Sequence, residues 1–176
     1  MSEKNWVELA NSRMWMEQMR ETNRYAERYG LTLSEEDMEL LLSEKSRILK
    51  SEGRIEFGRS ILPQIIQTFC DSSYISQDNY VDTLVRLQEI FYLYKNEMHD
   101  EITDEELLSF MKEQFEEVCF GDLQYLESTC LDIFAQAVRA GYGGFRETGG
   151  RGEFSRFDIV ERWDRDLYLM ALSQKF

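Results

Sequence analysis

Apolar residues recur along most of this chain at steps of three and four, which is the spacing of one face of an α-helix. The clearest run consists of Tyr80, Leu84, Leu87, Phe91, Tyr94 and Met98. A second run with the same steps consists of Leu108, Met111, Phe115 and Val118. Arg54–Phe57 alternates in the manner of a strand, but so short a segment cannot form a sheet alone. The pattern therefore predicts an all-α protein.

Helix starts carry a recurring motif, in which an apolar and a hydroxyl residue precede a polar and an apolar residue three positions later. It occurs at Leu33-Ser34 with Asp37-Met38, Ile75-Ser76 with Asn79-Tyr80, Ile102-Thr103 with Glu106-Leu107, and Phe154-Ser155 with Asp158-Ile159. The hydroxyl oxygen can cap exposed backbone N–H groups, and the apolar residues are spaced to touch as a hydrophobic staple. Since helical spacing follows each motif, we expect four helix N-termini at these places.

Together these signals predict a single-domain bundle of about seven helices. The expected ranges are 3–29, 35–51, 60–71, 76–98, 103–118, 122–140 and 156–174. Gly30, Gly53 and Gly121 are expected to follow helix C-termini, and Pro63 suits a first helical turn. We expect residues 1–140 to form the helical core, 141–153 a glycine-rich loop, and 154–176 a helix packing on the same domain. No residue pattern repeats with a period of about 20 to 50, so a solenoid is not predicted.

Further positions are predicted to face the core. They are Trp6, Ala10 and Met14 in the first helix; Met38, Leu41, Leu42, Ile48 and Leu49 in the second; and Leu123, Leu126, Cys130, Ile133, Phe134 and Ala137 in the sixth. The first helix also carries Trp15, Met16 and Met19, so its apolar surface is wide. Such a surface is usually core, and an adaptable methionine-rich groove for a partner is the alternative.

The chain is strongly acidic, with 34 acidic residues against 20 basic ones and a net charge of −14. This charge opposes non-specific binding to nucleic acid and to anionic membrane surfaces. The segment Glu97–Glu127 contains only Lys112 as a base, and forms either a solvated face or a site for a cation or basic partner. The sequence contains no apolar run long enough to span a membrane and no signal-peptide pattern, so we expect a cytoplasmic protein.

Few residues suit catalysis or metal binding. Cys70, Cys119 and Cys130 lie among apolar neighbours and are predicted to be reduced core thiols. His99 is the only histidine, and its place near a helix end indicates a linker or capping role, although a pairing with Cys70 stays open. Glu113, Glu116 and Glu117 could bind a divalent ion weakly, but a solvated face is the simpler interpretation. We therefore predict no metal, no cofactor and no catalytic residue.

The segment from Gly141 to Gly152 contains six of the ten glycines, and residues 139–156, with both ends counted, contain four arginines. It matches neither a Walker loop nor a dinucleotide-binding motif. It is either a connection that lets the last helix fold back, a partner-binding loop, or a site for a small anion. If it binds a partner, the candidate contact residues are Tyr142, Phe145, Arg146 and Arg151.

Several segments resemble an uncharacterised family of small proteins from Firmicutes. They are Ile55–Gly58, Ile61–Pro63, Phe69–Ser72, Tyr74–Tyr80, Leu87–Phe91 and Phe110–Phe115. The resemblance extends over roughly residues 20 to 140 and implies a bacterial cytoplasmic protein of unknown function. It assigns no catalytic or binding residue.

Two functions fit these observations. The first is a non-catalytic protein-interaction or accessory module that uses the surface near Gly141–Arg151. The alternative is a small-ligand-binding protein or enzyme with a carboxylate or arginine site between helices. A flat apolar patch would favour the first, and a cavity with convergent polar groups would favour the second.

Overall fold

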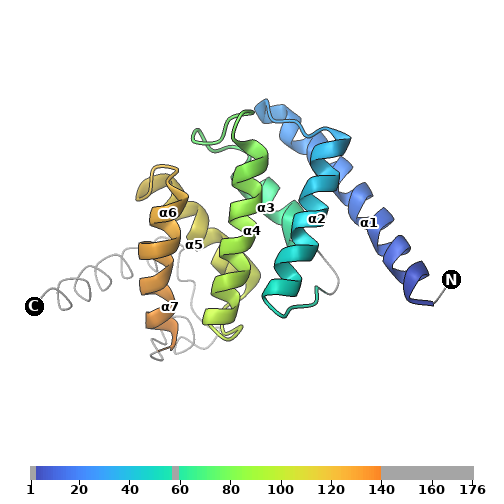
Figure 1. Ribbon diagram of the computed structural model, residues 1–176. Coiled ribbons are helices and arrows are strands. Elements are labelled where there is room, and N and C mark those ends of the chain that lie inside the picture. The colour runs from blue at the N-terminus through green and yellow to red at the C-terminus, as the bar shows by residue number, and fades with distance from the viewer. Residues whose placement is uncertain (1–2, 57–59, 140–176) are drawn as a thin grey trace, which may run out of the picture.

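The computed structural model describes residues 3–56 and 60–139, and all regular structure in this part of the chain is helical. The helices are α1 (Glu3–Ala26), α2 (Glu35–Ser51), α3 (Ile61–Phe69), α4 (Tyr80–Glu97), α5 (Asp104–Glu117), α6 (Leu123–Tyr125) and α7 (Asp132–Arg139) (Figure 1). A 3₁₀ turn, Glu27–Tyr29, extends α1, and a π-helical segment, Leu126–Leu131, joins α6 to α7 as one continuous helix. The all-α prediction is confirmed. The helix predicted over 156–174 lies outside the described residues.

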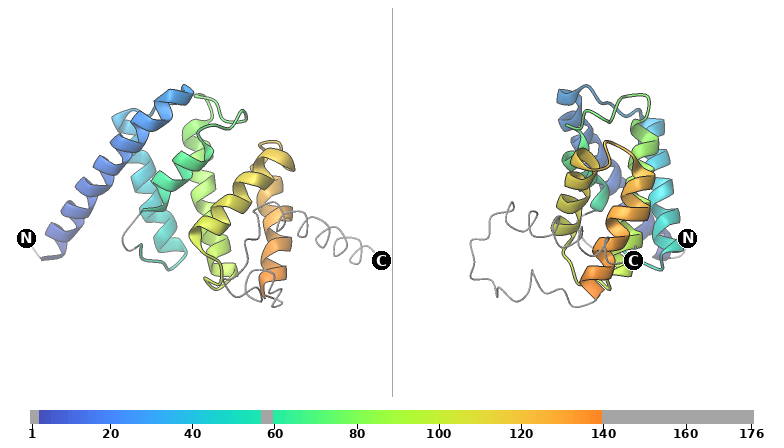
Figure 2. Two further views of the ribbon diagram at one scale, coloured as in Figure 1. Left: turned by 180° about the vertical axis from the view of Figure 1, so that it is seen from behind. Right: turned by 90° about the vertical axis from the view of Figure 1, so that its left-hand side faces the viewer.

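The helices lie in two layers (Figure 2). The first layer contains α1, α3 and α5, and the second contains α2, α4 and the continuous α6–α7 helix. Consecutive helices run in opposite directions and pair across the layers. The described part of the chain is therefore three helix pairs stacked side by side.

Side-chain bonds between neighbouring helices of the second layer show that the pairs repeat geometrically. Four of these bonds join residues 41 or 42 positions apart in the sequence: Arg47–Glu89, Arg54–Asn96, Arg86–Glu127 and Arg139–Glu97. Two further bonds at the end of α2, Arg54–Asp100 and Asn96–Glu52, span 46 and 44 positions. Such similar offsets indicate that neighbouring helices of this layer run parallel. The helix pair thus repeats in space although the residues do not repeat in sequence.

Two of the predicted helix caps are complete. At the start of α2 the Asp37 N–H donates to Ser34 Oγ at 3.0 Å, and the Ser34 N–H donates to Asp37 Oδ2 at 3.0 Å. The same reciprocal capping box joins Thr103 and Glu106 at the start of α5. Each box satisfies two of the N–H groups that a helix start leaves without intrahelical partners.

The predicted start of the fourth helix at Ser76 is wrong, because α4 begins at Tyr80. The Asn79 side chain accepts from the Ser76 N–H at 2.9 Å and donates to the Tyr74 carbonyl at 3.1 Å. It holds a turn before the helix and makes no cap bond to the helix itself. The motif marked a real chain reversal, but the helix starts four residues later.

The core lies between the layers. All six positions of the predicted α4 stripe are buried, as are Leu108, Met111 and Phe115 of α5. Val118 was wrongly predicted to be buried and is 39% exposed, because α5 ends one residue before it. The three cysteines are buried and none of them forms a disulfide, which agrees with the prediction of reduced core thiols.

The inward face predicted for α1 is also wrong. Ala10 is exposed and Met14 is 42% exposed, whereas Met19 and Ala26 are fully buried. Met14 lies five residues before Met19, which is about 140° around a helix of 3.6 residues per turn. Of the two apolar stripes on this helix, the structure buries the one that contains Met19. Within the methionine cluster, the core interpretation holds for Met19 and for the partly buried Met16, but not for Met14.

Candidate functional site

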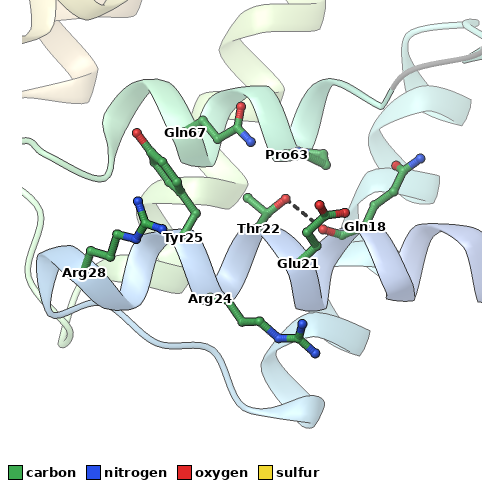
Figure 3. Close-up of a pocket in the computed structure, with 8 residues that line it drawn as sticks. All are labelled: Gln18, Glu21, Thr22, Arg24, Tyr25, Arg28, Pro63 and Gln67. Atoms are coloured by element: carbon green, nitrogen blue, oxygen red, sulfur yellow. Dashed lines mark hydrogen bonds between the residues drawn. The ribbon is translucent and has the colours of Figure 1, made fainter.

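A groove of about 450 Å³ lies between α1 and α3 on the outer surface of the first layer (Figure 3). It is lined by Gln18, Glu21, Thr22, Arg24, Tyr25 and Arg28 from α1 and by Pro63 and Gln67 from α3. We call it the α1–α3 groove. Its lining consists of polar and amphipathic side chains, unlike the core beneath it.

Helical spacing explains why these side chains gather. Gln18, Thr22 and Tyr25 follow one another at steps of four and three, so they share the face of α1 that borders α3. Pro63 and Gln67 are four residues apart and face them from α3 (Figure 3). The Tyr25 ring extends towards Gln67 across the groove, and Thr22 Oγ1 donates to the Gln18 carbonyl at 2.7 Å.

Two arginines at this groove have no carboxylate within 4.0 Å in the described part of the chain: Arg24 and Arg28. Arg20, one turn earlier, shows the opposite behaviour, since its guanidinium makes two hydrogen bonds to Glu35, at 3.0 and 3.1 Å. The Arg28 guanidinium lies over the Tyr25 ring, 5.6 Å from the ring centre, and Arg28 is exposed to solvent. In Figure 3 Arg28 borders the Tyr25 end of the groove, while Arg24 projects away from α3.

The groove also has unused hydrogen-bonding capacity. Gln18 Oε1 is buried and accepts no hydrogen bond within the described residues. A buried acceptor without a partner is costly, and because this atom is enclosed, a ligand N–H group would reach it only after the Gln18 side chain turned towards the groove. The arrangement can bind a carboxylate through arginine and a peptide or amide group through the glutamines.

A buried charge cluster lies inside the same end of the molecule. Lys45 of α2 is fully buried, and its Nζ lies 2.6 Å from Glu56 Oε2, 2.9 Å from Ser60 Oγ and 3.9 Å from the centre of the Trp15 ring. Glu56 Oε1 accepts from the Ile61 N–H at 2.5 Å, so the same carboxylate holds the start of α3. Burial lowers the pKa of Lys45, and Glu56 opposes that shift.

This cluster joins three elements of the fold. The partners of Lys45 tie α1, α2 and the start of α3 to each other. Sequence reasoning missed Lys45 because a lysine is almost never fully buried. A signal did exist, since Lys45 continues the inward spacing of Met38, Leu41 and Ile48.

The residues that the sequence singled out fall elsewhere. Tyr142, Phe145, Arg146 and Arg151 lie outside the described residues, so their partner-binding role stays a prediction. His99 is exposed just beyond the end of α4, as expected for a linker residue, with a left-handed φ of 51°.

The acidic helix face is partly paired. Glu116 forms an ion pair with Lys112 at 3.2 Å, and Lys112 also pairs with Asp71 at 2.5 Å. Among the described residues no group of three or more histidine, cysteine, aspartate or glutamate side chains is arranged to hold a metal ion. Over the same residues, no helix combines the length and the apolar character needed to cross a membrane.

A model of a family of unknown function (DUF6323) matches residues 18–144. No curated protein and no solved structure shows significant similarity to the chain. The matched range includes all the lining residues of the α1–α3 groove and ends before most of the glycine-rich segment.

Proposed function

We propose that this protein, which belongs to the family of unknown function DUF6323, is a non-catalytic protein-interaction module that binds a partner through the α1–α3 groove. The observation that carries the proposal is the set of groove side chains that have no carboxylate or hydrogen-bond partner among the described residues. Arg24 and Arg28 have no carboxylate within the described residues, and Gln18 Oε1 has no donor.

The residue types support a protein partner. Tyrosine and arginine dominate the energetics of many protein interfaces, because they combine a large contact area with directional hydrogen bonds. Tyr25 is 36% exposed and Tyr29 is 49% exposed, and the centres of their rings are 5.9 Å apart. Together with Arg28 they form a continuous aromatic and cationic surface along α1.

The stacked helix pairs give this surface a rigid support. The buried Lys45–Glu56 pair anchors α1, α2 and the start of α3 beneath one end of the groove. A partner would therefore meet walls that are already in place, which reduces the entropy lost on binding.

Site-specific photo-crosslinking in the native host tests the proposal. Replacing Tyr25 with the photoreactive p-benzoylphenylalanine keeps an aromatic side chain at the groove. The matched control carries the same group at Leu40, which is 49% exposed on α2. We expect a discrete adduct from position 25 that is lost when Arg28→Ala is added, and no such adduct from position 40. Equal labelling at both positions, or none at position 25, contradicts the proposal.

A small carboxylate ligand is the second candidate, and the size of the groove favours it. Its volume of about 450 Å³ falls in the range of about 300–1,000 Å³ that is usual for ligand pockets. Thermal-shift titration with benzoate, succinate and citrate tests this function. A rise in melting temperature that Arg28→Gln abolishes, and that Lys50→Gln on exposed α2 surface does not, would favour it.

The cellular setting is part of the proposal. The resemblance to Firmicutes proteins supports a bacterial origin, and three cysteines that form no disulfide support a reducing compartment such as the cytoplasm. The glycine-rich segment remains a second proposed contact surface, with Tyr142, Phe145, Arg146 and Arg151 as its anchors.

A further inference from the structure

Cys119 and Cys130 bring two thiol groups into contact inside the third helix pair. Their Sγ atoms are 3.6 Å apart although the residues are separated by 11 positions. Cys119 is 6% exposed and Cys130 is 8% exposed, and neither forms a disulfide. A disulfide has a sulfur–sulfur length of about 2.05 Å, so a shift of about 1.5 Å would bring the two atoms to bonding distance.

Two departures from regular α-helix create this contact. Cys119 lies in the turn after α5, where its N–H donates to the Gln114 carbonyl at 2.8 Å. The next two residues, Phe120 and Gly121, have left-handed φ angles of 49° and 82°, which turns the chain back over the end of the helix.

Cys130 lies in the π-helical segment Leu126–Leu131. A π-helical segment accommodates an extra residue in its turn, and such segments are uncommon and concentrate at functional sites. Here the segment carries the sulfur that faces Cys119. The two irregular segments thus meet at their cysteines.

We propose that Cys119 and Cys130 form an oxidisable dithiol, which a peroxide converts to an intramolecular disulfide. One thiolate attacks a peroxide oxygen to give a sulfenic acid, and hydroxide leaves. The second thiol then attacks the sulfenic sulfur, forms the S–S bond and releases water. Overall, two thiols and hydrogen peroxide give one disulfide and two waters, so the protein loses two electrons and two protons.

The two cysteines have different roles in this reaction. Burial, followed by hydrogen bonding to Cys130, raises the pKa of the Cys119 thiol to about 12. The thiol that loses its proton attacks the peroxide, and the neighbouring thiol, 3.6 Å away, resolves the sulfenic acid. Because both thiols are buried, the reaction is slower than that of an exposed thiol and accelerates as the pH rises.

Cys70 provides an internal control. It is also buried and free, and its sulfur contacts the Gln67 carbonyl at 3.7 Å. No other described cysteine sulfur lies in contact with it. Cys70 can therefore be oxidised to an acid or form mixed disulfides, but it cannot form the internal bond.

Mass spectrometry of the full chain treated with hydrogen peroxide tests the proposal. We expect a mass loss of about 2 Da that dithiothreitol reverses, as two hydrogens leave. A protease that cleaves after glutamate separates Cys119, in residues 118–127, from Cys130, in residues 128–147. These two peptides are expected to be covalently joined after oxidation, with Cys70 still available to an alkylating reagent.

Serine variants assign the bond. Cys119→Ser and Cys130→Ser are each expected to abolish the mass loss, and Cys70→Ser is expected to retain it. If a variant fails to fold, the joined peptides of the wild-type protein decide the question alone. Three alkylatable thiols after peroxide treatment, or a sulfinic acid on Cys130 without joined peptides, overturn the proposal. This result is independent of the α1–α3 groove and of its partner.

Discussion

Gly121 lies directly against the side chain of Tyr74, so that a Cβ built on Gly121 would stand 2.6 Å from the Tyr74 Cβ. The contact joins the turn after α5 to the connection between α3 and α4. It is extended by the ring of Phe120, whose centre lies 6.4 Å from that of Tyr74. Gly121 therefore meets two requirements at once, a left-handed φ of 82° and the absence of a side chain.

Substituting this glycine should be much more costly than substituting a glycine that meets only the first requirement. Gly53 has a φ of 65° but open space around its Cβ position, so Gly53→Ala is the matched control. We expect Gly53→Ala to destabilise the fold by about 1 to 2 kcal/mol, the usual cost of a left-handed alanine. Gly121→Ala is expected to cost clearly more, measured by urea unfolding, and equal losses would show that the Tyr74 contact is unimportant.

The second prediction concerns the buried Lys45–Glu56 pair. Lys45→Met leaves the Glu56 carboxylate without its partner in a buried position, and breaking such a pair typically costs about 3 to 5 kcal/mol. Adding Glu56→Gln should recover part of this loss, because the amide is neutral and its oxygen can still accept from the Ile61 N–H.

Urea unfolding of the single and double variants measures the recovery. The control is Lys50→Met in the exposed last turn of α2, which is expected to change stability by no more than about 0.5 kcal/mol. A double variant as unstable as Lys45→Met would mean that lost packing, and not the unpaired charge, causes the effect.

The third prediction is a pH dependence at Arg54. Its guanidinium bonds to Asp100 at 2.7 and 3.1 Å and lowers the pKa of that carboxyl. A lowered folded pKa gives stability that is present above the unfolded pKa, which is about 3.9 for aspartate, and is lost as the pH falls through the folded value. The melting-temperature deficit of Arg54→Gln should therefore be largest near neutral pH and shrink in acid.

A second variant separates the contributions of Arg54. Asp100→Asn removes the titrating group, and asparagine tolerates the φ of 56° at this position. Its deficit should also shrink in acid. The bond from Arg54 to Asn96 at 2.7 Å does not titrate, so part of the Arg54→Gln deficit should persist. A deficit independent of pH in both variants would exclude the ion pair as its cause.

The fourth prediction concerns the proposed contact residues of the glycine-rich segment. Replacing Tyr142, Phe145, Arg146 and Arg151 together with alanine should leave the melting temperature nearly unchanged and abolish partner capture. Aromatic and arginine anchors provide most of the binding energy at an interface, while residues that bind only a partner add little to folding. Differential scanning calorimetry with a co-purification assay measures both. A large fall in melting temperature would instead indicate that these side chains pack on the helical core.

Local sequence signals predicted much of the secondary structure, because a helix is determined by neighbours three and four residues away. The capping boxes at Ser34 and Thr103 and the α4 stripe needed no knowledge of distant residues. The first helix shows where this method fails. It carries two apolar stripes, and only its packing against α3 and α2 decides that Met19 is buried and Met14 is exposed.

The candidate site was beyond prediction for the same reason. The α1–α3 groove joins Tyr25 to Gln67, and the dithiol joins Cys119 to Cys130 across an irregular turn and a π-helical segment. Neither the irregular turn nor the π-helical segment has a residue pattern from which its geometry can be predicted. The stacking of helix pairs could not be predicted either, because it repeats the direction of the helices without repeating residues.

The sequence by itself determined that this protein is helical, acidic and built on a core of regularly spaced apolar residues, since these properties depend on composition and local spacing. The tertiary structure alone decided which stripe of α1 is buried, which lysine is enclosed, and which arginines have no carboxylate partner among the described residues. These outcomes depend on contacts between residues far apart in the chain. Such contacts form, and contribute free energy, only when the helices pack together.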